Sequence, residues 1–282
     1  MIRSRIRGFA TCLLAVTLMT AASLASSAST AATSGADLAK LEAVVNGDQR
    51  SAAHKARDKY RHPVETLAFF GIRPDMTVVE LWPFGGWYTE IIAPYVKDKG
   101  IYYAAAMDPT STDREDVEYN AELKHLLDAH PDLYGKVRWS VLAKGKYDIA
   151  PDGSADMVVT FRNIHNWVWA GDEKQVFEAA FRALKPGGIL GVEEHRANDP
   201  KAEPKRGEAY VGEDYAIGLI QSVGFKLAGR SNINRNPKDT KDYPKGVWTL
   251  PPSFAMGDQD RAKYAAIGES DRFTLRFVKP KN

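Results

Sequence analysis

Apolar and polar positions along the chain form short hydrophobic runs that alternate with longer amphipathic segments. The short runs are rich in β-branched residues and predict strands at residues 77–82, 100–107, 137–142, 157–161, 189–195, 225–230 and 272–278. The spacing of apolar residues between them predicts helices at residues 88–96, 113–130, 172–184 and 214–223, the third beginning at Asp172, a candidate N-cap residue. Strands that alternate with helices predict an α/β fold, a doubly wound, mostly parallel seven-stranded sheet whose ligand crevice lies at the carboxyl ends of the strands.

Two further segments frame this alternation. Residues 37–62 predict an N-terminal helical cap, and the main domain is expected to span residues 63–282. Residues 231–271 are polar, proline-rich and too long for a simple connection, so we predict an insertion before the last strand. This insertion is expected to be either a functional loop or a surface elaboration on the edge of the sheet.

The N-terminus has the pattern of an export signal. Three arginines precede an apolar run at residues 9–25, and a tract of small residues follows it. Threonine and serine interrupt the apolar run, which favours a cleavable signal peptide over residues 1–31 rather than a permanent membrane span. No two of the arginines are adjacent, which favours the Sec route. We therefore expect the mature protein to be periplasmic or secreted.

Composition and charge narrow the chemistry. The one cysteine, Cys12, lies inside the predicted signal, so the mature chain has no disulfide, thiolate metal site or cysteine nucleophile. The formal charge of +2 includes Arg3, Arg5 and Arg7, and removing these three positive charges leaves −1. This balance lacks the basic footprint of a nucleic-acid-binding protein. We expect a small-molecule substrate, and the sequence leaves the oligomeric state open.

The stretch VVELWPFGGWYTE, residues 78–90, has the pattern of a ligand-binding turn between a strand and a helix. Glu80 lies near the end of the strand, and Gly85 and Gly86 permit the positive φ and the close ligand approach that such turns use. Asp108 ends the next strand, 28 positions after Glu80. The pairing of the two acids with the glycines is more specific than a glycine loop alone.

Two bulky residues depart from the usual pattern of this turn. Trp82 and Phe84 stand where such loops commonly have glycine, and Pro83 favours an extended backbone at Trp82. The two rings either present a π face to a bound cation, worth about 0.5 to 2 kcal/mol, or fill the crevice as part of the core.

Four stretches together resemble the class I S-adenosylmethionine-dependent methyltransferases, and more narrowly an exported bacterial branch labelled as predicted methyltransferases. They are VVELWPFGGWYTE, the strand that ends at Asp108, APDGSADMVVTFRNIHNW and ALKPGGILGVEEHR. The resemblance covers the chain from residue 63 onward and implies a Rossmann-like fold. It also implies S-adenosylmethionine as the cofactor and methyl transfer to an unidentified small molecule or envelope component.

The resemblance implies roles for residues of the first two strands. Gly85 and Gly86 would face the methionine part of the cofactor, and Glu80 would support their loop. Asp108 would hold the ribose hydroxyls. Trp82 joins these residues as a candidate for cofactor binding because its ring can face the sulfonium.

Polar residues follow the fourth and fifth strands, whose ends should meet at one edge of the sheet. Arg162 and Asn163 are candidates for binding the cofactor carboxylate or an anionic acceptor. An acceptor that loses a proton needs a base within hydrogen-bond reach, and His165, His195 and Glu194 are the candidates for catalysis. Each of these three can equally be a structural hydrogen-bond partner or a helix cap.

Two other functions stay open at this point. One is an exported protein that binds an adenosyl compound or another small ligand without catalysis, and the other is a metal-assisted hydrolase. The hydrolase would bind zinc or manganese through His165, His195, Glu193 and Glu194. These histidines are not four positions apart, so we expect no metal. The export signal argues against the methyltransferase, because S-adenosylmethionine is made in the cytoplasm and a chain exported unfolded cannot carry it.

Two outlying groups of residues are further candidates for the mouth of the crevice. They are Arg57, Tyr60, Arg61 and His62 ahead of the first strand, and Lys238, Lys241, Tyr243, Lys245 and Trp248 in the insertion. Either group can instead be solvated surface.

Overall fold

The computed structural model describes residue 1 and residues 33–281. The predicted signal peptide lies outside the described residues except for Met1, so export stays a prediction. Within the part of the chain that is described, no helix combines the length and the hydropathy that a membrane crossing requires.

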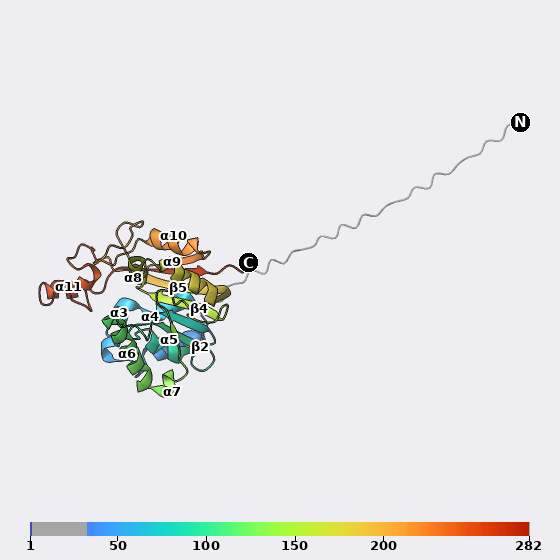
Figure 1. Cartoon of the computed structure of the whole chain (residues 1–282), viewed down its shortest axis with the longest axis horizontal. Coiled ribbons are helices and arrows are strands. Elements are labelled where there is room, and N and C mark those ends of the chain that lie inside the picture. Colours follow the sequence, from blue (N-terminus) through green and yellow to red (C-terminus); the bar gives the residue numbers. More distant parts are fainter. Residues whose placement is uncertain (2–32, 282) are drawn as a thin grey trace. The chain divides into compact units, whose positions relative to one another are not determined.

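A seven-stranded sheet organises residues 33–281 (Figure 1). The strands lie in the spatial order β3-β2-β1-β4-β5-β7-β6. Neighbouring strands from β3 to β5 are parallel, and β7 is antiparallel to both β5 and β6. The bounds are Thr77–Leu81 for β1, Ile101–Ala106 for β2, Arg138–Val141 for β3, Ala155–Phe161 for β4, Leu184–His195 for β5, Lys226–Ser231 for β6 and Arg272–Val278 for β7. The predicted doubly wound, mostly parallel sheet is confirmed, and its strand order switches direction between β1 and β4.

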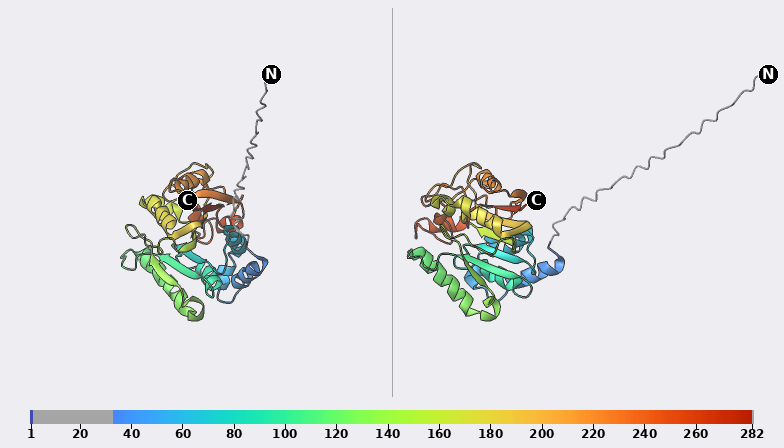
Figure 2. Two further views of the ribbon diagram at one scale, coloured as in Figure 1. Left: turned by 90° about the vertical axis from the view of Figure 1, so that its right-hand side faces the viewer. Right: turned by 45° about the vertical axis from the view of Figure 1, so that its right-hand side comes forward.

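Helices cover both faces of the sheet, those of the N-terminal half on one face and α8 to α10 on the other (Figure 2). Phe70 and Ile91 lie in the apolar core of the first face, and Trp167 and Phe177 lie in that of the second. The helices are α1 (Gly35–Val45), α2 (Ala52–Lys55), α3 (Asp58–Arg61), α4 (Pro63–Phe70), α5 (Thr89–Val96), α6 (Arg114–Ala129), α7 (Pro131–Tyr134), α8 (Ile164–Ala170), α9 (Glu173–Ala183), α10 (Glu213–Ser222), α11 (Arg261–Ile267) and the 3-10 helix η1 (Gly246–Thr249). Strands buried on both faces explain the nearly continuous apolar runs in the sequence.

The two segments outside the alternation also have defined structure. The segment predicted as an N-terminal cap forms α1 to α3, with α1 beginning two residues earlier, at Gly35. α1 packs against α4 and α5, and its Leu41 and Val45 are buried there. The predicted insertion, residues 231–271, lies between β6 and β7 and contains η1 and α11.

Two local features differ from the sequence-based expectations. The periodicity did not predict α8, because its seven residues make two turns and include β-branched and aromatic residues with modest helix propensity. Burial of Ile164 and Trp167 stabilises this helix instead. Asp172 is the N-cap residue of α9, as predicted, but its carboxylate makes no capping bond and instead accepts a hydrogen bond from the Tyr147 hydroxyl at 3.3 Å.

Glu80 is a carboxyl group inside the core between β1 and β2. The residue is 3% exposed, and its Oε2 accepts hydrogen bonds from Thr89 Oγ1 at 3.1 Å and from the Tyr102 hydroxyl. Burial is the main cause that raises the pKa of Glu80 to about 7. Glu80 therefore links β1 to β2 and to the first residue of α5, and it carries a proton in the folded chain below neutral pH.

Glu80→Gln should remove one component of the pH dependence of stability. Folded Glu80 keeps its proton up to about pH 7, whereas an unfolded glutamate loses it near its ordinary pKa of 4.5. The wild type therefore loses stability as the pH rises through this window, by about 3 kcal/mol in all. Urea unfolding of both proteins between pH 4.5 and 8 should show this change in the difference between their unfolding free energies. Parallel pH profiles would contradict the prediction.

Candidate active site

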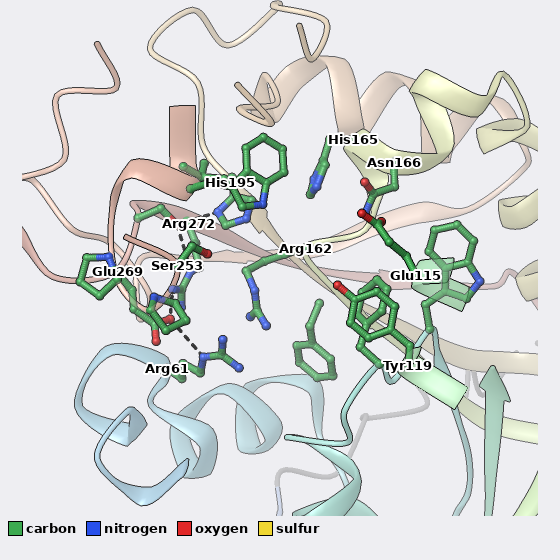
Figure 3. A pocket seen from close by; sticks show the side chains of 18 of the residues that line it. Arg61, Glu115, Tyr119, Arg162, His165, Asn166, His195, Ser253, Glu269 and Arg272 are labelled. Atoms are coloured by element: carbon green, nitrogen blue, oxygen red, sulfur yellow. Dashed lines mark hydrogen bonds and ion pairs between the residues drawn. The ribbon is translucent and has the colours of Figure 1, made fainter. Parts of the chain in front are cut away.

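A cavity of about 650 Å³ opens at the carboxyl ends of β1, β2, β4 and β5 (Figure 3). Arg57 and Arg61, at the two ends of α3, line one side of it, and residues 247, 248 and 251–253 of the insertion line another. The volume lies in the range of small-molecule sites. The cavity occupies the crevice position that a doubly wound sheet predicts.

His165 and Glu194 form a buried hydrogen-bonded pair beside the cavity. His165 Nδ1 lies 3.2 Å from Oε1 and 3.3 Å from Oε2 of Glu194. The same two oxygens accept backbone N–H bonds from His195 and Ile164, each at 2.7 Å. A carboxylate held in this way accepts the proton of Nδ1 and leaves a lone pair on Nε2. His165, which lines the cavity, can therefore accept a proton from a bound ligand.

His195 lies beside His165 in the cavity wall, with the two ring centroids 5.5 Å apart. Its Nδ1 hydrogen bonds with Ser270 Oγ at 2.6 Å. Burial, followed by repulsion from Arg272 and from His165 in its protonated form, holds the pKa of His195 well below its ordinary value. His195 is therefore a neutral imidazole at neutral pH.

One end of the cavity is aromatic and acidic. Trp82, Phe84 and Tyr119 line it, with ring centroids 6.0 Å apart for Trp82 and Phe84 and 4.6 Å apart for Phe84 and Tyr119. Glu115 and Asp116, in the first turn of α6, line the same end, where Figure 3 shows Glu115 beside Tyr119. Carboxylates and aromatic faces suit a cation or a ligand that carries hydroxyl groups.

The opposite end of the cavity is basic. Arg57 Nε and Arg61 Nε donate hydrogen bonds to the Glu269 carboxylate at 2.6 Å and 3.1 Å. Arg272 donates to the same carboxylate and, through Nη1, to Glu193 at 3.1 Å. Burial alone would raise the pKa of Glu269, but the three arginines outweigh it and hold that pKa below its ordinary value.

Arg162 completes the basic end from the carboxyl end of β4. Its Nη1 donates to Glu193 Oε2 at 3.1 Å. Its φ of 63° lies in the left-handed region that non-glycine residues seldom adopt. A bond of 2.7 Å from its backbone N–H to the Glu193 carbonyl holds this conformation and directs the side chain into the cavity.

Trp82 lines the cavity in a conformation that local sequence did not predict. Its φ is 48°, whereas the proline after it favours an extended backbone. The indole Nε1 donates to the Leu142 carbonyl at 2.7 Å, and the ring packs 5.6 Å from that of Trp167. These tertiary contacts outweigh the local preference. The ring forms part of the cavity wall and leaves the cavity open.

Gly85 and Gly86 face α6 rather than the cavity. A Cβ at Gly85 would lie 2.8 Å from Glu122 Oε2, and a Cβ at Gly86 would lie 2.3 Å from Leu126 Cδ2. Gly86 also has a φ of 82°, which favours glycine. The two glycines thus allow α6 to pack closely on the loop.

Asp108 and Asn163 lie outside the cavity lining. The Asp108 carboxylate accepts hydrogen bonds from Lys146 at 2.5 Å and from the backbone N–H of Thr110 at 2.9 Å, and these bonds lower its pKa to about 2. Asn163 Nδ2 donates to the Leu81 carbonyl at 3.0 Å, beneath the floor of the cavity. Glu80, described above, likewise bonds within the core.

His165, Glu194 and His195 could also act together as metal ligands, because one ligand atom from each lies within 4.8 Å of the others. A cation there would compete with two backbone N–H donors for the Glu194 oxygens. Glu193, the fourth candidate, pairs instead with Arg162 and Arg272, whose positive charges adjoin the set. The donor set fits a hydrogen-bonded pair better than a metal centre.

Comparisons with known proteins add to this geometry. No protein-family model matches the chain, and no curated protein matches its sequence. Solved structures do match. The fold is similar to that of a SAM-dependent methyltransferase from Aquifex aeolicus, with a TM-score of 0.53, 16% identity and coverage of 86% of this chain and 98% of that chain. It is also similar to the [4+2]-cyclase SpnF, with a TM-score of 0.55, 16% identity and coverage of 87% and 94%.

The chain has the fold of the class I methyltransferases. Both similarities extend over nearly the whole of the other chain, so the match is to a complete domain. One of the two similar structures is by name a cyclase, so the methyltransferase fold alone does not fix the reaction.

Several residues of the site had little or no signal in the sequence. Glu115 and Tyr119 reach the cavity from α6, although the sequence pattern around them is that of an exposed helix. Glu269 and Arg272 are buried, and a charged residue at the start of the apolar run RFTLRFV was the one available clue. Of the outlying candidates, Arg57, Arg61 and Trp248 line the cavity, whereas Tyr60, His62 and the lysines and tyrosine of the insertion do not.

Arg272→Met should destabilise the protein by about 3 kcal/mol, because it leaves two buried carboxylates with fewer positive partners. The matched control is Arg114→Met, which removes an arginine whose side chain is 88% exposed and should change stability by less than about 0.5 kcal/mol. The measurement is the unfolding free energy in urea at pH 7. Equal effects of the two substitutions would contradict the role assigned to Arg272.

Proposed function

We propose that this protein is an S-adenosylmethionine-dependent methyltransferase that acts on a small molecule. One observation carries the proposal: a single cavity has an acidic, aromatic end and a basic end, with the His165–Glu194 pair beside it (Figure 3). The fold supports the reaction class, and the opposite charges of the two ends support a cationic cofactor and a separate acceptor.

The acidic, aromatic end fits S-adenosylmethionine through other residues than the resemblance implies. Its three rings line an open cavity and offer π faces to a sulfonium. Glu115 and Asp116 supply carboxylate acceptors for ribose hydroxyls, the role that the resemblance implies for Asp108. The bound cofactor supplies an electrophilic methyl group.

His165 serves as the general base. Glu194 fixes the orientation and the tautomer of the ring, so that Nε2 takes the proton from the acceptor, and its charge then stabilises the imidazolium. The rings of Trp169 and Trp248 lie 5.1 Å and 6.1 Å from that of His165 and exclude water from its surroundings. His195 stays neutral and forms the part of the cavity wall next to His165.

Calorimetric titration of the purified protein with S-adenosylhomocysteine tests cofactor binding. The wild type should bind, and Glu115→Gln should weaken binding by about 10- to 100-fold through loss of charge-assisted hydrogen bonds. Asp108→Asn is the matched control and should leave the affinity within about twofold, because Asp108 bonds to Lys146 outside the cavity. The opposite ranking would return the ribose role to Asp108. A wild type that binds neither this compound nor S-adenosylmethionine would overturn the proposed function.

His165→Asn should separate binding from catalysis. The loss of a positioned base should reduce methyl transfer by about 100- to 10,000-fold, while S-adenosylhomocysteine binds as in the wild type. The assay follows a tritiated methyl group from S-adenosylmethionine into a small-molecule extract. Unchanged transfer would assign His165 a structural role.

A further inference from the structure

The basic end of the cavity carries more positive than negative charge. Four guanidinium groups share two carboxylates: Arg57, Arg61, Arg162 and Arg272 with Glu193 and Glu269. Among the described residues, these arginines form no ion pairs beyond this network. Two positive charges therefore lack a partner in a largely buried setting, which is costly unless a ligand supplies negative charge.

Arg61 has hydrogen-bond donors that the protein leaves unused. The residue is 4% exposed, and its Nε bonds to Glu269 while its guanidinium lies over the Trp87 ring, 4.6 Å from the centroid. Within residues 33–281, neither of its Nη atoms has a hydrogen-bond acceptor. Burial, followed by the charge of Arg162, lowers the pKa of Arg61 to about 9. The unused Nη donors and the lowered pKa are those expected of an arginine that binds an anionic ligand.

Arg162 approaches Arg61 from the other wall. Figure 3 shows the guanidinium groups of Arg61 and Arg162 pointing toward one another across the cavity, below His165. Arg162 uses Nη1 for Glu193, which leaves its remaining N–H groups available to a ligand. Two forks that face one another match the oxygens of a carboxylate or a phosphate, which can accept two parallel N–H bonds from each guanidinium.

We propose that Arg61 and Arg162 bind a carboxylate or phosphate group of the molecule that is methylated. This inference rests on the proposed function and specifies its substrate class as a small anion. The anion neutralises the excess charge of the basic end. Its binding anchors the acceptor at the opposite end from Glu115 and within the same cavity as His165.

The test titrates the purified wild type, saturated with S-adenosylhomocysteine, with succinate and in parallel with inorganic phosphate. Tryptophan fluorescence reports binding, because Trp87 contacts Arg61 and Trp248 lines the cavity. At least one of the two anions should give a saturable change, and the preferred one distinguishes a carboxylate from a phosphate substrate. The absence of a saturable response to both anions would overturn the proposal.

Variants localise the response. Arg162→Gln should weaken anion binding by about 10- to 100-fold. Because the Arg162 side chain is partly exposed, the variant should still fold, and its circular dichroism spectrum checks this. Arg73→Gln makes the same charge change just before β1, at the amino ends of the strands and away from the cavity. There Arg73 forms a surface ion pair with Asp75. This control should bind the anion as the wild type does. Equal weakening by both variants would mean a non-specific charge effect and would overturn the proposal.

A further arm separates the acceptor from the cofactor. The compound 5′-methylthioadenosine lacks the carboxylate of S-adenosylhomocysteine. If Arg162→Gln weakened binding of S-adenosylhomocysteine but not of 5′-methylthioadenosine, the arginines would hold the cofactor, and the acceptor site would be overturned while the methyltransferase function stood. Anion binding by a protein that binds no S-adenosylhomocysteine would instead overturn the proposed function and leave the anion site in place.

Discussion

The buried guanidinium of Arg272 is the interaction on which the cavity depends. Its side chain is 2% exposed and joins Glu193, near the end of β5, to Glu269 in the insertion. Glu269 in turn holds Arg57 and Arg61 of the N-terminal segment. An unpaired charge at this depth would cost several kcal/mol, so each member of the network requires the others. The network thereby fixes three segments, far apart in the sequence, as one wall of the cavity.

The network makes one end of the cavity positively charged, and other residues make the opposite end negatively charged. Carboxylates on α6 and aromatic rings after β1 form one end, and the arginines form the other. A similar structure that is named as a cyclase shows that this fold serves more than one reaction, so the charge distribution and the His165–Glu194 pair carry the functional argument. Opposite charges at the two ends suit a sulfonium and an anionic acceptor that must meet near one base.

Features that depend on neighbouring residues in the sequence were predictable, whereas features held by contacts between distant residues were not. The seven strands were predictable because burial on both faces leaves continuous apolar runs in the sequence. The proximity of His165, His195 and Glu194 was predictable because parallel neighbours β4 and β5 end at the same edge of the sheet. The conformation of Trp82 was not, because the bond to Leu142 that holds it joins residues 60 positions apart.

The sequence by itself determined the α/β fold, the position of the crevice and the polar residues that border it, since these depend on periodicity and on strand ends. The tertiary structure alone decided which of those residues reach the cavity. Gly85 and Gly86 accommodate α6, and Asp108 pairs with Lys146, while Glu115 and Arg61 line the cavity from helices outside the sheet. The physical reason is that packing and charge between distant segments determine the partner of each side chain, and the local spacing of residues does not predict these contacts.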